Sequence, residues 1–102
     1  MERNPQQFER TFREHHDAVL AYALRRTGDD DARDAVAETF LVAWRRFGEA
    51  PGDGQLAWLY GVARRVLANQ RRAAGRRTAL VDRLGTAAAA AEAPGSRAGG
   101  VS

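Results

Sequence analysis

Apolar residues recur at three- and four-residue steps over the first two thirds of the chain, which is the spacing of one helix face. The first such segment runs from about Pro5 to Arg26. Its apolar stripe consists of Phe8, Phe12, Val19, Tyr22 and Ala23. Pro5 suits the first turn of a helix, and Thr27-Gly28 suits its end. The pattern therefore predicts a first helix with one buried face.

A second helix is predicted from the aspartates at 29–31 to about Phe47. Any of the three aspartates can cap its start, and their charge favours the positive end of the helix dipole. Gly48 is expected to end it. The buried stripe is expected to contain Ala32, Val36, Phe40, Ala43 and Phe47.

A loop rich in glycine and proline, Glu49 to Gly54, separates this segment from a third predicted helix. The third helix should run from about Gln55 to Ala74, with Gly75 closing it. Its core face is expected to contain Leu56, Leu59, Ala63, Val66 and Leu67.

The remainder of the chain has few apolar residues that could join a hydrophobic core. Thr78–Leu84 could form a weak helical turn, and the alanine-rich stretch after Gly85 has no hydrophobic face to dock. The sequence therefore predicts an all-α protein: a compact three-helix bundle at residues 5–77 and a largely disordered, linker-like tail at residues 78–102.

The strong core formers are few, which limits what the protein can be. Leu, Val and Phe supply 19 of the 102 residues, and 15 of these lie between Phe8 and Leu67. So small a core excludes a large multidomain enzyme and a deep substrate cavity. The chain has no cysteine, which excludes disulfides and thiolate metal sites. No apolar run is long enough to span a membrane, and Met1–Arg13 is too polar for a signal peptide, so we expect a cytoplasmic protein.

Catalytic and metal-binding patterns are weak. The only histidine cluster is Glu14-His15-His16-Asp17, and adjacent histidines on a helix point about 100° apart, so we interpret it as a solvated stretch. There is no glycine-rich phosphate loop and no nucleophile beside a base. We therefore expect no enzyme activity, no metal, no cofactor and no small-molecule substrate.

The net charge of +3 conceals an asymmetry. Residues 1–51 carry 8 arginines against 10 acids, and residues 52–102 carry 8 arginines against 3 acids. All 16 basic residues are arginine, which either reflects a GC-rich genome or exploits the guanidinium fork that binds phosphate. Between Gln55 and Leu84 there are seven arginines and a single acid, Asp82. The split suggests two kinds of partner.

Two helix faces carry the candidate chemistry. On the third helix, Trp58 and Tyr60 precede a series of arginine and amide side chains, a combination suited to phosphates, base edges and unpaired bases. The alternative is a solvated basic face whose aromatics belong to the core. The second helix presents a mixed acidic and aromatic face, which favours a protein interface over a merely solvated surface. The residues of this second face are Asp34, Glu38, Leu41, Trp44 and Arg45.

Three stretches resemble one family. Asp31–Arg45, with the sequence DARDAVAETFLVAWR, is similar to region 2.2 of the extracytoplasmic-function sigma factors of bacterial RNA polymerase. Trp58–Arg65, WLYGVARR, resembles the segment that opens their regions 2.3 and 2.4, and Val19–Gly28 resembles region 2.1. The resemblance extends in order from about Phe8 to Arg77.

The resemblance implies a transcription initiation module. The second helix would bind the clamp helices of the polymerase β′ subunit through Asp34, Glu38, Leu41, Trp44 and Arg45. The loop Phe47 to Gln55 would capture a base flipped from the single-stranded minus-ten promoter element, and the third helix would contact neighbouring nucleotides. The implied DNA-binding residues are Phe47, Asp53, Gln55, Trp58, Arg64, Arg65, Asn69, Arg71 and Arg72.

The family's region 4, a helix-turn-helix domain, has no counterpart here, and the chain stops within what would be the interdomain linker. The alternative function is therefore an interaction protein or decoy. It would bind polymerase or an anti-sigma factor without promoter-specific initiation.

Overall fold

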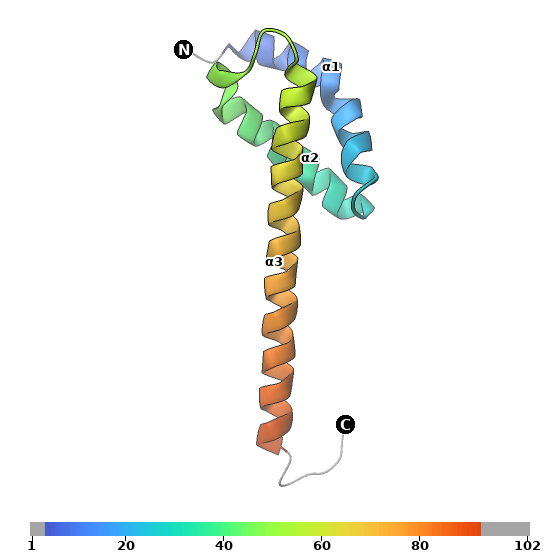
Figure 1. The fold of residues 1–102 in the computed structure, drawn as a ribbon, viewed down its shortest axis with the longest axis vertical. Coiled ribbons are helices and arrows are strands. Elements are labelled where there is room, and N and C mark those ends of the chain that lie inside the picture. Colours follow the sequence, from blue (N-terminus) through green and yellow to red (C-terminus); the bar gives the residue numbers. More distant parts are fainter. Residues whose placement is uncertain (1–3, 93–102) are drawn as a thin grey trace. The chain divides into compact units, whose positions relative to one another are not determined.

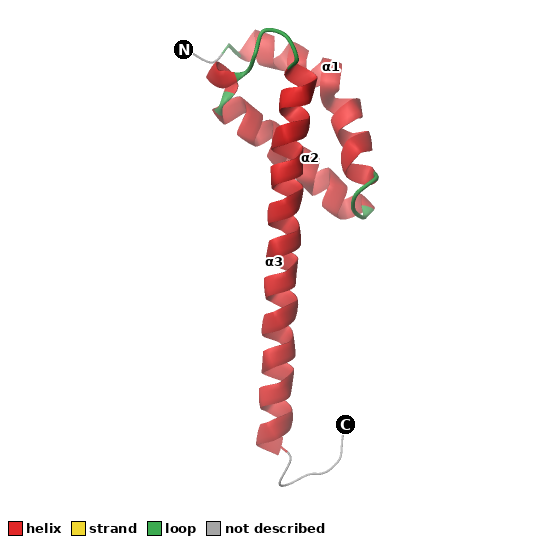
Figure 2. Cartoon of the chain, in the orientation of Figure 1, coloured by secondary structure: helices red, strands yellow, loops and turns green. Residues whose placement is uncertain are grey.

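The computed structural model describes the backbone of residues 4–92 and the side chains of residues 4–91. The elements are α1 (Pro5–Leu24), α2 (Asp29–Arg45), the short 3-10 helix η1 (Phe47–Glu49) and α3 (Gln55–Glu92) (Figure 1). Helices and loops account for all of residues 4–92, with no strand among them (Figure 2). The predicted all-α class with three helices is confirmed.

The starts of α1 and α2 are stabilised in different ways. The Asn4 Oδ1 atom accepts hydrogen bonds from the backbone N–H groups of Gln6 (3.0 Å) and Gln7 (3.1 Å), which caps α1 ahead of its first-turn proline. The N-cap of α2 is Gly28, without a side-chain cap. The expectation that one of the aspartates 29–31 caps this helix is wrong. All three lie in its first turn, where their carboxylates favour the positive end of the helix dipole.

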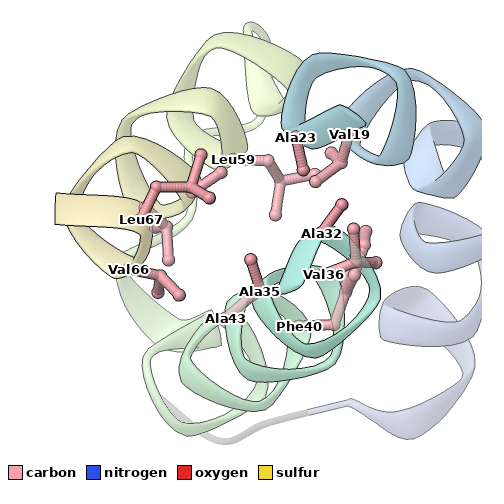
Figure 3. Packing of buried hydrophobic residues seen from close by; sticks show 12 residues of the cluster. Val19, Ala23, Ala32, Ala35, Val36, Phe40, Ala43, Leu59, Val66 and Leu67 are labelled. Atoms are coloured by element: carbon pink, nitrogen blue, oxygen red, sulfur yellow. The ribbon is translucent and has the colours of Figure 1, made fainter. Parts of the chain in front are cut away.

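The core lies between α1, α2 and the first half of α3, whose apolar side chains point toward one another (Figure 3). Leu59, Leu67 and Val19 are the largest apolar side chains that are fully buried. The predicted stripe of the second helix is buried throughout, so that prediction is confirmed. In α3 the predicted Leu56 is only partly buried, while Val62, which was not predicted, joins the core.

Aromatic rings join α1 to α2. The Phe8 ring stands edge-on to those of Trp44 (5.2 Å between centroids), Phe47 (5.4 Å) and Phe40 (6.4 Å). Phe12 stands edge-on to Phe40 at 4.8 Å. Because Phe8 lies early in α1 and Trp44 late in α2, these contacts show that the two helices run antiparallel.

The histidines of α1 are less exposed than the sequence suggested. His15 and His16 are both partly buried, and the His16 ring stacks on Phe40 at 6.1 Å and lies 5.0 Å from the Phe12 ring. The interpretation as a solvated stretch is therefore wrong for the two histidines and holds for Glu14 and Asp17, which are exposed. His16 extends the aromatic contact between α1 and α2.

The chain forms two compact units, Met1–Gln70 and Arg71–Ser102, and the boundary falls inside α3. The predicted helix end at Gly75 is wrong, because α3 continues through Gly75 and Gly85 to Glu92. A glycine inside a helix costs about 1 kcal/mol, but the arginine, leucine and alanine residues around these two are good helix formers. Thr78–Leu84, expected to form only a weak helical turn, is part of α3, and the disorder predicted from Gly85 onward is wrong for residues 85–92. The rest of the predicted tail lies outside the described residues. No helix within residues 4–92 is both long enough and apolar enough to cross a membrane.

Candidate functional site

The first candidate surface, which we call the α2 outer face, lies opposite the buried stripe of α2. Leu41 is 43% exposed. Trp44 is partly buried, and its contact with the Phe8 ring fixes its position at the edge of this face. The exposed charged members are Asp34, Glu38 and Arg45. The residues at 34, 38, 41 and 45 are spaced to lie along one side of the helix.

The second candidate surface, the α3 basic face, belongs to the part of α3 within the first unit. Arg64, Arg65 and Asn69 are exposed there. Trp58 is partly buried and packs against the hydrophobic core. The structure thus leaves the polar groups exposed while the tryptophan packs against the core.

Tyr60 has a structural role in the fold. Its ring stacks on that of Tyr22 with centroids 4.9 Å apart, and the Arg26 guanidinium lies 3.7 Å from the Tyr22 ring centroid. Arg26 also donates a hydrogen bond to the Tyr22 carbonyl at 3.1 Å. These contacts join the end of α1 to α3. They agree with the alternative interpretation, which gave the aromatic residues of the third helix a structural role.

Arg71 and Arg72 are the first residues of the second unit, and both are exposed. Within the described part of that unit, exposed arginines also occur at Arg76, Arg77 and Arg83, against the exposed acid Asp82. The described part of the second unit is therefore a basic helical segment.

The third candidate site is a pocket of about 350 Å³ between α1 and the loop that follows α2. We call it the loop pocket. Its volume lies near the lower end of the range of roughly 300–1,000 Å³ typical of small-molecule sites. Its lining residues are Gln7, Arg10, Thr11, Glu14, Phe47, Gly48, Ala50, Pro51, Gly52 and Gln55.

Two consecutive hydrogen bonds hold the walls of the loop pocket together. The Thr11 hydroxyl donates to Gln55 Oε1 at 2.8 Å, and Gln55 Nε2 donates to the Pro51 carbonyl at 3.1 Å. Thr11 is only 5% exposed, so an unsatisfied partner there would carry a desolvation cost. This relay joins α1, the loop and the first residue of α3.

Two further features lie at the two ends of the loop. At its start, Arg46 Nη2 lies 2.9 Å from Glu49 Oε1, and this hydrogen bond, with the accompanying charge attraction, raises the pKa of Arg46 and lowers the pKa of Glu49. At its end, Gly54 has a φ of 76°, in the left-handed region that favours glycine. Its carbonyl accepts the Trp58 N–H at 3.1 Å, which closes the first turn of α3.

Two of the three predicted loop residues, Phe47 and Gln55, line this pocket, and Asp53 does not. Phe47 is buried, with 8% of its surface exposed, yet it lines the pocket, as does Gln55. Asp53 is exposed and is not among the lining residues. The α1 wall, formed by Gln7, Arg10, Thr11 and Glu14, was missed. No signal in the sequence places a segment some forty residues upstream beside this loop.

Comparison with known proteins identifies the family. The Sigma-70 region 2 family matches residues 11–77. Relatives include the ECF RNA polymerase sigma factor SigL of three Mycobacterium tuberculosis strains, each 43% identical over 84 residues, or 76% of this chain and 47% of the relative. The chain thus spans about half the length of these curated relatives. No solved structure gives a significant match. The chain belongs to the sigma-70 region 2 family and resembles its extracytoplasmic-function members, in agreement with the motifs along its helices.

Proposed function

We propose that this chain is a transcription initiation module that binds core RNA polymerase and the melted minus-ten promoter element. The loop pocket carries the proposal, because it lies at the loop to which the family resemblance assigns base capture. The mechanism is capture and not catalysis. Both proposed partners place the activity in the cytoplasm.

The loop pocket is suited to a single extruded base. Phe47, Ala50 and Pro51 present apolar surface that can contact the faces of a ring, and α1 presents polar groups that can meet its edge. Extruding a base costs a few kcal/mol in lost stacking and pairing, least where the strand is already melted. Binding in the pocket would offset that cost and stabilise the open strand.

The α3 basic face would hold the strand on either side of the captured base. Arg64 and Arg65 would contact phosphates, and Asn69 would contact a base edge. Arg71 and Arg72 of the second unit are proposed as further phosphate contacts. Asp53, at the exposed tip of the loop, is proposed to meet the strand outside the pocket.

The α2 outer face would bind the clamp helices of the β′ subunit. A partly exposed leucine and tryptophan surrounded by charged residues resemble an interface anchor with a polar rim. The same face is the proposed docking site if an anti-sigma factor competes with polymerase.

The test measures both partners with the full chain. We expect the protein to co-purify with core polymerase and to retain a promoter bubble at low salt. Replacing Arg64 and Arg65 together by alanine should lower the slope of log affinity against log salt by roughly 1.4, because two phosphate contacts are lost. Arg33→Ala is the matched control: it removes an exposed α2 arginine that is 3.3 Å from Asp29 and should leave the slope unchanged.

The outcomes separate the proposal from its alternative. Binding to polymerase without any retention of the bubble would support the decoy function. Failure to bind either partner would refute the initiation module and the polymerase-binding form of the decoy.

A further inference from the structure

The two walls of the loop pocket differ in chemistry. The wall formed by the loop carries Phe47, Ala50 and Pro51 with two glycines, and none of these side chains can donate or accept a hydrogen bond. Gln55 and Thr11 use their polar groups to hold the walls together. The polar side chains left to meet a ligand edge therefore come from α1.

Those groups form one series on α1. Gln7, Arg10 and Glu14 are spaced three and four residues apart, all three are exposed, and all three line the pocket. Arg10 offers only hydrogen-bond donors, and the Glu14 carboxylate offers only acceptors. The wall thus presents donor and acceptor groups one helical turn apart.

Arg10 and Glu14 do not neutralise each other. The ion pairs formed by α1 over residues 5–24 join Arg13 to Glu9 (2.7 Å), Glu14 to His15 (3.9 Å) and His16 to Asp17 (3.1 Å). The contact between Glu14 and His15 is long, so the Glu14 carboxylate keeps acceptor capacity toward the pocket.

A carboxylate at this position is unfavourable for general DNA affinity, because it repels the phosphates that the arginines of α3 would attract. The same carboxylate helps the pocket to discriminate between bases. A base that offers it no N–H group would leave the charged acceptor without a hydrogen bond when that base is captured. Removing the carboxylate should therefore raise the affinity for DNA and lower the selectivity between bases.

We propose that Arg10 and Glu14 of α1 determine which base the loop pocket accepts, with Glu14 increasing selectivity at the expense of affinity. The inference rests on the proposed function, since it requires that the pocket bind a base of the melted strand. Glu14 accepts the N–H groups of the base edge, and Arg10 donates to its ring or carbonyl acceptors.

The experiment uses the full chain and a set of promoter bubbles in which each position of the non-template strand carries each of the four bases in turn. The wild-type protein should show one position at which the best and worst bases differ on the order of tenfold in affinity. Glu14→Gln should bind all four bubbles more tightly and reduce that ratio several-fold. Arg10→Gln should bind all four more weakly and also reduce the ratio.

The matched control is Glu9→Gln, which removes an exposed α1 carboxylate of the same charge that does not line the pocket. It should leave the ratio unchanged. Circular dichroism should show unchanged helix content in all three variants, because each replaces an exposed side chain.

Other results would overturn the inference in distinguishable ways. If Glu14→Gln tightens binding equally for every base and leaves the ratio intact, the carboxylate acts only as a charge. If the wild type binds bubbles without discriminating at any position, base selection by α1 fails while DNA binding stands. If the wild type binds no bubble, the proposed function fails together with the inference.

Discussion

The α2 outer face takes all its residues from one helix, whereas the loop pocket combines α1, the α2–α3 loop and the first residue of α3. A surface on one helix keeps its arrangement as long as that helix is folded. A pocket between segments depends on every contact that holds those segments together. The two sites should therefore respond differently to the same kind of perturbation.

Three features of the loop and its neighbours shape the loop pocket. The Thr11–Gln55–Pro51 relay joins its walls, Gly54 supplies the left-handed turn into α3, and the Arg46–Glu49 pair orders the start of the loop. None of these contacts involves the exposed residues of the α2 outer face. A variant that loosens the loop should therefore spare polymerase binding.

The largest effect is expected from a core change that removes both sites together. Leu59 is fully buried between the three helices, so Leu59→Ala should lower the free energy of unfolding by about 2–5 kcal/mol. Urea unfolding followed by circular dichroism measures this loss. Polymerase and bubble binding should decline in parallel. Loss of one activity alone would contradict a shared core.

A change on the α2 outer face should affect one partner only. Leu41→Ala should weaken polymerase binding by roughly thirtyfold, or about 2 kcal/mol, if Leu41 anchors the interface. The stability of the fold should change by less than about 0.5 kcal/mol because the side chain is exposed. Leu24→Ala is the matched control, since Leu24 on α1 is 40% exposed against 43% for Leu41. Equal binding losses in the two variants would argue against a specific face.

A change in the relay should affect the pocket only. Thr11→Val keeps the shape of the side chain but removes the donor to Gln55, and should cost about 1 kcal/mol of stability. We expect weaker capture of the promoter bubble with polymerase binding unchanged. Thr11→Ser retains the hydroxyl and should restore capture. If the valine variant captures the bubble normally, the relay does not position the pocket.

The smallest effect concerns the loop's ion pair and pH. The pKa of Glu49 is lowered in the folded chain by its hydrogen bond to Arg46, so its stabilising contribution is present above the unfolded-state pKa. That contribution is lost as the pH falls through the lowered folded-state pKa. Glu49→Gln should remove this part of the pH dependence of unfolding between about pH 6 and pH 3. An unchanged pH profile would show that the exposed pair contributes nothing measurable.

The sequence predictions were correct where a repeated pattern of residues supported them and wrong where they depended on a single residue at a helix end. The buried stripe of α2 was predicted correctly because its apolar residues already follow the helix period. The end of α3 was placed too early because Gly75 was taken as a stop, although the good helix formers around it continue the helix. The N-cap of α2 was assigned to one of the aspartates 29–31, but it is Gly28. Residue propensities alone do not distinguish between these neighbouring positions.

The sequence by itself determined the helical class, the family motifs and the separation of an acidic and aromatic helix face from a basic one. These features depend on residue type and on a period of a few positions, so they can be read along the chain. Only the tertiary structure revealed the α1 wall of the loop pocket and the relay from Thr11 through Gln55 to Pro51. The Thr11–Gln55 hydrogen bond joins residues 44 positions apart. Its geometry depends on how the antiparallel α1 and α2 pack through Phe8 and its aromatic neighbours.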